Sequence, residues 1–275
     1  MSKSGDQLRE RYARFPSAGE ALFIVMALFA AEYVVAAALR DLRGLSGIDP
    51  RDIDGVVTVL GNGVVFSVLL YYKRMTYASL FHPSANSVGA TLATVSVPIL
   101  VMIPALVFAI TGVVIGLEAM FPVPRWQQAM FERMMSNPFA TIVATCILAP
   151  LLEEMLFRGV MLRAFLLQYP RRQAFLYSAA IFGLAHLNIY QFAVGFLLGL
   201  LLAWLYERTR SLWPCILLHA AYNSGITYLW FSHREDSTVY WDVSAPALLL
   251  YLALGAGGFY VLRRILDTRP AASSQ

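Results

Sequence analysis

The sequence predicts an all-α membrane protein, a polytopic transmembrane bundle of about eight spanning helices. Hydrophobic residues make up 59% of the 275 positions and charged residues only 14%, which lies well outside the range of soluble globular proteins. Several apolar runs are also long enough to cross a bilayer. The two cysteines, Cys146 and Cys215, both lie in apolar runs, so we expect neither a disulfide framework nor a cysteine-rich metal site.

Three spans are expected in the first half of the chain. A basic arm at residues 1–17, interfacial or disordered, precedes the first span at 18–39. A charged loop leads to the second span at 56–72, and a long third span follows at 88–117. Residues 122–138 then alternate apolar and polar side chains near helical spacing, which is typical of a short helix lying in the membrane interface.

One carboxylate stands inside the first span. Glu32 lies near the middle of this apolar run and must face protein or water, because a charge is costly in lipid. We expect its role to be structural rather than chemical. The second span contains Gly61-Asn62-Gly63, which indicates a notch for close packing or for a polar contact.

Five more spans are expected in the second half. Gly195, Gly199 and Ala203 recur at fourfold spacing and predict one face of close helix contact. No repeat or low-complexity segment interrupts the chain, so residues 18–262 should form a single transmembrane domain with its motif-bearing core at 139–231. The tail at 263–275 is expected to be disordered. The five predicted spans are 139–167, 173–190, 191–206, 212–231 and 244–262.

The basic residues predict the orientation in the membrane. With eight spans, 15 of the 21 lysine and arginine residues fall on one side and 6 on the other. Both termini should therefore be cytoplasmic. Short loops and a compact single domain favour the plasma (inner) membrane of a bacterium. The net charge of +4 comes mostly from loop arginines and indicates membrane orientation, so no nucleic acid partner is expected.

The most unusual stretch is a charged run inside the fourth span. A charge at the centre of a bilayer helix costs about 2.5–3.5 kcal/mol on insertion scales, so such residues need partners and mark functional sites. Glu154 and Arg158 stand at i and i+4 and can pair, whereas Glu153 is rotated about 100° away. One glutamate can thus be supporting while the other is left for chemistry.

Pro150 lies three residues before Glu153 and has no backbone N–H. In an α-helix it would free the carbonyl of Cys146, four residues earlier, so a bend is expected just before the carboxylate.

The histidines divide into two groups. His82 and His233 lie in loops and need no catalytic role, whereas His186 and His219 are each expected inside an apolar helix. Asn223 stands one turn after His219, and Phe182 stands one turn before His186. Because these residues accompany the glutamates on neighbouring helices, we predict a shared site.

These side chains suit hydrolysis by an activated water. A carboxylate beside a histidine can orient water and take its proton, and a histidine with an asparagine amide can donate to the oxyanion that forms. The zinc signature His-Glu-x-x-His and the serine elbow Gly-x-Ser-x-Gly are both absent. We expect no cofactor or metal, although a Glu/His/His set can in principle bind zinc.

Three motifs carry a resemblance to a known family. Residues 149–159, Ala-Pro-Leu-Leu-Glu-Glu-Met-Leu-Phe-Arg-Gly, contain a run similar to the Glu-Glu-x-x-x-Arg motif of the CAAX protease and bacteriocin-processing family. Phe182 to His186 resembles its Phe-x-x-x-His motif, and His219 to Asn223 resembles its His-x-x-x-Asn motif. The motifs occur in the family's order, but the first three spans show nothing that resembles it.

The resemblance implies an intramembrane glutamic-type endopeptidase, similar to the Ras-converting CAAX prenyl endopeptidases, with a membrane-anchored protein or peptide as its substrate. It implies that Glu153 is the general base, that His186 helps to hold the water, and that His219 and Asn223 form an oxyanion hole. The supporting residues would be Glu154, Arg158 and Phe182.

Two other functions stay open at this stage. In a proton-coupled transporter the buried acids and histidines would form a relay, although no inverted repeat is found. A non-catalytic membrane scaffold or immunity protein would tolerate the loss of Glu153. The relay would comprise Glu32, Glu153, Glu154, His186 and His219.

Overall fold

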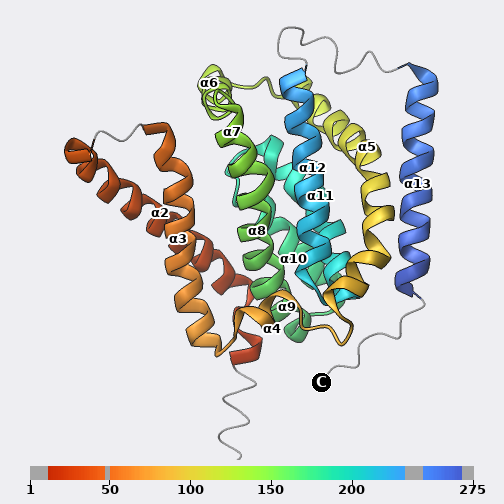
Figure 1. Cartoon of the computed structure of the whole chain (residues 1–275), viewed down its shortest axis with the longest axis horizontal. Helices are drawn as coiled ribbons and strands as arrows, with labels where there is room; N and C mark the ends of the chain where they lie inside the picture. The colour runs from red at the N-terminus through yellow and green to blue at the C-terminus, as the bar shows by residue number, and fades with distance from the viewer. Residues whose placement is uncertain (1–11, 47–49, 233–243, 268–275) are drawn as a thin grey trace, which may run out of the picture.

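The computed structural model describes residues 12–46, 50–232 and 244–267, and within these ranges every regular element is a helix (Figure 1). The prediction of an all-α polytopic bundle is confirmed. The first half contains α2 (Ala18–Ser46), α3 (Pro50–Lys73), α4 (Tyr77–Phe81), α5 (Val88–Met120) and α6 (Arg125–Met134). The second half contains α7 (Pro138–Thr141), η1 (Ile142–Leu148), α8 (Ala149–Glu153), η2 (Glu154–Leu162), α9 (Arg163–Gln168), α10 (Arg171–Leu184), α11 (Ile189–Thr209), α12 (Leu212–Ser232) and α13 (Ala245–Asp267).

Six stretches of the described chain are helical, long and apolar enough to cross a membrane, so the predicted count of eight is not confirmed. Of the two other predicted spans, α10 has 14 residues and extends about 21 Å, short of the ~30 Å hydrocarbon core. The helix α12 is long enough but carries polar residues such as His219 and Asn223. The six are Ala18–Leu39, Val56–Lys73, Val88–Met120, Pro138–Gln168, Ile189–Thr209 and Ala245–Asp267.

Several predicted boundaries are wrong. The helix α10 ends at Leu184, so His186 lies in the turn before α11 and not inside a helix. The last helix continues to Asp267, where Leu266 is buried, so residues 263–267 are not part of a disordered tail. The segment between the predicted second and third spans, where only a loop with His82 was expected, contains α4 with a capping box at Thr76. His233 lies outside the described residues.

The described end of the N-terminal arm, residues 12–17, is attached to the bundle and is not disordered. Lys73 at the end of α3 donates through Nζ to the carbonyl oxygen of Tyr12 at 3.0 Å. Gln168 at the end of α9 donates to the carbonyl oxygen of Pro16 at 2.8 Å. These contacts satisfy buried polar groups and bring the start of α2 next to the ends of α3 and α9.

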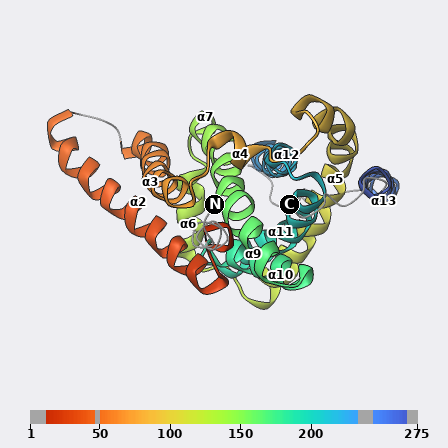
Figure 2. The same cartoon turned by 90° about the horizontal axis from the view of Figure 1, so that it is seen from below.

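The core lies around η2, in which all nine residues are buried. A helix that is buried on every side must be surrounded by other helices, and η2 contacts α4 and α9 to α12. The pair α2 and α3 stands on one side of this centre, and α5 with α13 stands on the other (Figure 1, Figure 2). The charged run of the sequence therefore occupies the middle of the molecule.

The predicted notch in α3 receives Glu32 of α2. Asn62 is buried and donates through Nδ2 to Glu32 Oε1 at 3.1 Å. A Cβ atom on Gly61 would lie 2.5 Å from Glu32 Cγ, so only glycine allows this approach. The contact gives the membrane-embedded carboxylate a hydrogen-bond partner, as a structural role requires.

The predicted small-residue face of α11 packs on α10. A Cβ atom on Gly195 would lie 3.0 Å from Gly183 Cα, and one on Gly199 would lie 3.1 Å from Ala179 Cα. The absence of side chains lets the two backbones approach closely. This contact fixes the turn with His186, which joins the two helices.

Candidate active site

The helix that carries the two glutamates switches from α-helical to π-helical hydrogen bonding twice. Residues 138–168 are continuously helical, but η1 and η2 are π-helices with bonds between residues five apart. Glu153 is the last residue of the α-helical turn between them, and Glu154 is the first residue of η2. Pi-helical segments are rare and are frequently found at functional sites.

Glu154 is completely buried and holds two partners. Its Oε1 atom accepts from Arg158 Nη1 at 3.0 Å, and both side chains have 0% exposure. This confirms the pairing expected from the i, i+4 spacing. The same oxygen lies 2.8 Å from His219 Nδ1, and Arg158 Nη2 donates to the carbonyl oxygen of Gly199 at 3.4 Å.

The ring of His219 lies between the two glutamates. Its Nδ1 atom faces Glu154, whereas its Nε2 atom lies 3.8 Å from Glu153 Oε2. The Glu153 side chain is 29% exposed and has no arginine partner among the described residues, so its carboxylate stays accessible. The two adjacent glutamates thus occupy different environments, one buried and paired, the other open.

Phe182 connects the three motifs. Its ring centroid lies 5.3 Å from that of His186, 5.7 Å from that of His219 and 4.9 Å from that of Phe157. The guanidinium carbon of Arg158 lies 4.3 Å from the Phe182 ring centroid, in a cation–π contact. His186 Nδ1 lies 3.0 Å from the carbonyl oxygen of Phe182, which can only accept, so Nδ1 carries the proton.

Asn223 lies one turn after His219 on α12 and contacts η1, in the helical stretch that also carries the two glutamates. Its Nδ2 atom donates to the carbonyl oxygen of Thr145, in η1, at 2.8 Å. An amide nitrogen carries two hydrogens, so one of them stays available.

The structure brings the predicted residues into one region. Direct side-chain contacts link five of them: Glu153, Glu154, Arg158, Phe182 and His219. His186 is bonded to the backbone of Phe182, and Asn223 to the backbone of Thr145. Sequence reasoning missed the partners Thr145 and Gly199, because both take part through backbone carbonyls, which leave no signal in side-chain identity. It also missed the bond between His219 and Glu154.

A metal site is not apparent in the described ranges. No group of three or more histidine, cysteine, aspartate or glutamate side chains is arranged to hold a metal ion there. The close set at the centre contains His219 with two carboxylates, one of which is already bonded to Arg158.

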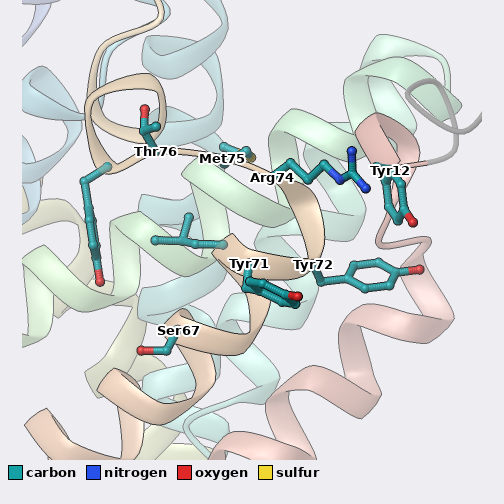
Figure 3. Close-up of a pocket in the computed structure, with 9 residues that line it drawn as sticks. Tyr12, Ser67, Tyr71, Tyr72, Arg74, Met75 and Thr76 are labelled. Carbon is teal, nitrogen blue, oxygen red and sulfur yellow. The ribbon is translucent and has the colours of Figure 1, made fainter. Parts of the chain in front are cut away.

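A separate groove of about 920 Å³ opens beside the end of α3 (Figure 3). Arg74 and several tyrosines line it, and Arg74 lies over the ring of Tyr12 at 5.8 Å. None of the motif residues lines this groove. The residues around it are Tyr12, Ser67, Leu70, Tyr71, Tyr72, Arg74, Met75, Thr76 and Tyr77.

Comparison with known proteins agrees with the motifs. Residues 135–225 match the family model described as Type II CAAX prenyl endopeptidase Rce1-like. Over 105 residues the chain is 30% identical to a protein of Bacillus subtilis (strain 168) described as "Putative membrane peptidase YdiL". This match covers 37% of the chain and 41% of the relative, so the chain spans less than half of the relative's length in it. No solved structure matches the chain. The resemblance carried by the three motifs is thereby confirmed: residues 135–225 of this integral membrane protein of several spans are similar to the Rce1-like CAAX prenyl endopeptidases.

Proposed function

We propose that the protein is an intramembrane endopeptidase in which Glu153 activates a water molecule and His219 and Asn223 bind the oxyanion. The observation that carries the proposal is the different environment of the two glutamates on either side of the His219 ring. Glu154 is engaged by Arg158 and His219, whereas Glu153 is open to water and substrate.

Glu153 is the general base in this mechanism. A base must reach a water molecule and must not be neutralised by a fixed cation. The partly exposed carboxylate of Glu153 can reach water, and the nearby guanidinium of Arg158 is bonded to Glu154 instead. The proton that Glu153 takes from water would later pass to the leaving amine.

His186 would hold the attacking water from the second motif. Its Nδ1–H is used by the Phe182 carbonyl, so Nε2 of the neutral ring presents a lone pair that can accept from water. The turn between α10 and α11 allows the ring to stand at a helix end, where it is partly exposed.

His219 and Asn223 would donate to the oxygen of the attacked carbonyl. With Nδ1–H donating to Glu154, His219 donates through Nε2 only when both ring nitrogens are protonated. In that state the ring donates to Glu154 through Nδ1 and to the oxyanion through Nε2.

The substrate class follows from the membrane setting and the comparisons. The matched family is described as a CAAX prenyl endopeptidase, and the curated relative as a membrane peptidase. We therefore propose a membrane-anchored protein or peptide as substrate, with prenylated C-terminal peptides as the first class to test. Both descriptions name peptidases, so the transporter and scaffold hypotheses gain no support from them. The proposed location is a bacterial plasma membrane with both termini cytoplasmic.

The function is tested by comparing cells that produce the wild-type protein with cells that produce Glu153→Gln at equal abundance. Mass spectrometry of protein C-termini should find cleaved products of membrane-associated proteins only with the wild type. The substrate found in this way would then be incubated with the purified protein in lipid nanodiscs. Equal product lists from both strains would overturn the proposal.

A further inference from the structure

Pro150 ends the first π-helical segment and leaves one backbone carbonyl without a donor. The last π-type bond of η1 runs from the N–H of Ala149 to the carbonyl oxygen of Ala144. The next bond of this ladder would run from residue 150 to Thr145, but proline has no N–H. The expectation for the Cys146 carbonyl assumed α-helical spacing, whereas in the π-helical spacing of η1 the carbonyl opposite residue 150 is that of Thr145.

The freed carbonyl is the one that Asn223 uses. Asn223 Nδ2 donates to the carbonyl oxygen of Thr145 at 2.8 Å, a short and well-formed bond. The Thr145 hydroxyl does not compete, since it donates to the carbonyl oxygen of Thr141 at 2.7 Å. If residue 150 had an N–H, the backbone itself would supply a donor at the same oxygen.

We propose that Pro150 is a positioning residue for the oxyanion hole, acting through the Thr145 carbonyl on the Asn223 amide. This inference rests on the proposed function. Because Pro150 has no N–H, no backbone donor from this residue competes with Asn223 Nδ2 for the Thr145 carbonyl oxygen. One amide hydrogen is thereby fixed on Thr145, and the rigid amide plane directs the other toward the site. A donor that is oriented before the reaction begins needs no reorganisation in the transition state.

The test is a double-mutant cycle between Pro150→Ala and Asn223→Ala, measured on a cleavable substrate in nanodiscs. Pro150→Ala supplies the missing N–H, and we expect it to lower kcat about tenfold with little change in KM. In the Asn223→Ala background the same substitution should have no further effect, because the group that it positions is gone. Equal factors in both backgrounds would overturn the inference and leave Pro150 a purely structural role.

Pro104→Ala provides the matched control, since Pro104 is also inside a long apolar helix but is exposed and lies outside the three motifs. It should leave kcat and KM unchanged.

Thermal unfolding should show that Pro150→Ala is no less stable than the wild type, because alanine favours helix where proline does not. Glu153→Gln, measured in parallel, separates the two hypotheses. If it is as active as the wild type, the proposed function fails; if it is inactive but the cycle is additive, only the role of Pro150 fails.

Discussion

At the scale of single residues, burial and charge pairing distinguish two chemically identical side chains. Glu153 and Glu154 are adjacent in the sequence, yet Glu154 has 0% exposure and holds Arg158 and His219, whereas Glu153 is 29% exposed. A buried charge without a partner is strongly destabilising, so Glu154 needs the hydrogen bonds that it makes with Arg158 and His219. Glu153 has no such constraint and can serve the reaction.

The first prediction separates the two glutamates. Glu153→Gln should abolish cleavage at normal protein abundance, because it removes the base but keeps the shape. Glu154→Gln should lower abundance, since it leaves the buried Arg158 charge uncompensated at a cost of about 3–5 kcal/mol. Cleavage assays and immunoblots of membranes measure both effects. If both variants were inactive at unchanged abundance, a mainly structural role for Glu154 would be wrong.

The second prediction concerns the oxyanion donors and metal dependence. Asn223→Ala should lower kcat by about a hundredfold or more with a smaller effect on KM, the usual scale for losing such a donor. Cleavage by the purified protein should survive exhaustive chelation, because a ring nitrogen that donates a proton cannot at the same time bind zinc. The mechanism would be falsified if chelation stopped cleavage and added zinc restored it.

At the scale of helices, small residues decide how closely the elements of the site approach. Gly199 of α11 faces Ala179 of α10, and its carbonyl oxygen accepts from Arg158 of η2. Three helices of the site therefore meet at a position without a side chain. The π-helical segments act at the same scale, since they set which carbonyl is free for Asn223.

The third prediction tests this contact. Gly199→Ala would place a Cβ atom 3.1 Å from both Cα and Cβ of Ala179, and overpacking of this kind costs about 1–3 kcal/mol. Thermal unfolding in detergent should therefore occur at a lower temperature, with reduced activity because Arg158 is displaced. Gly116→Ala in α5 is the control: a Cβ atom there meets nothing within 4 Å, so its Tm should be unchanged or higher. Equal Tm values for both variants would contradict the packing argument.

At the scale of the whole molecule, the motif-bearing helices form the centre and the remaining spans flank it. The helix η2 is buried on all sides, while α2, α3, α5 and α13 present exposed apolar side chains suited to lipid. The helices that can face lipid are therefore separate from η2, and the buried charges of Glu154 and Arg158 lie away from the hydrocarbon.

The fourth prediction concerns topology. Because the basic residues divide 15 to 6 between the two sides of the eight-span arrangement, both termini should be cytoplasmic. Reporter fusions at Ser274 and within residues 232–242 should lie on opposite sides, since α13 stands between them as a candidate span. Reporters in the same compartment would show that α13 does not cross the membrane.

The sequence by itself determined the class of the protein and predicted the residues of the candidate site. Composition and apolar run length are sufficient for an all-α membrane bundle, because in lipid only internally bonded helices or closed barrels satisfy the backbone. The pairing of Glu154 with Arg158 was also predictable, since it is set by local helical geometry. The three motifs identified the other members, although their proposed roles remain predictions.

Only the tertiary structure decided how these residues meet. The bond between His219 and Glu154 joins positions 65 residues apart. The sequence shows that a buried carboxylate needs a partner, but it does not show which residue that partner is. The placement of His186 in a turn depends on where α10 ends against α11, which helix propensity alone does not fix. The π-helical spacing of η1 places the Thr145 carbonyl opposite Pro150, whereas α-helical spacing applied to the sequence pointed to Cys146.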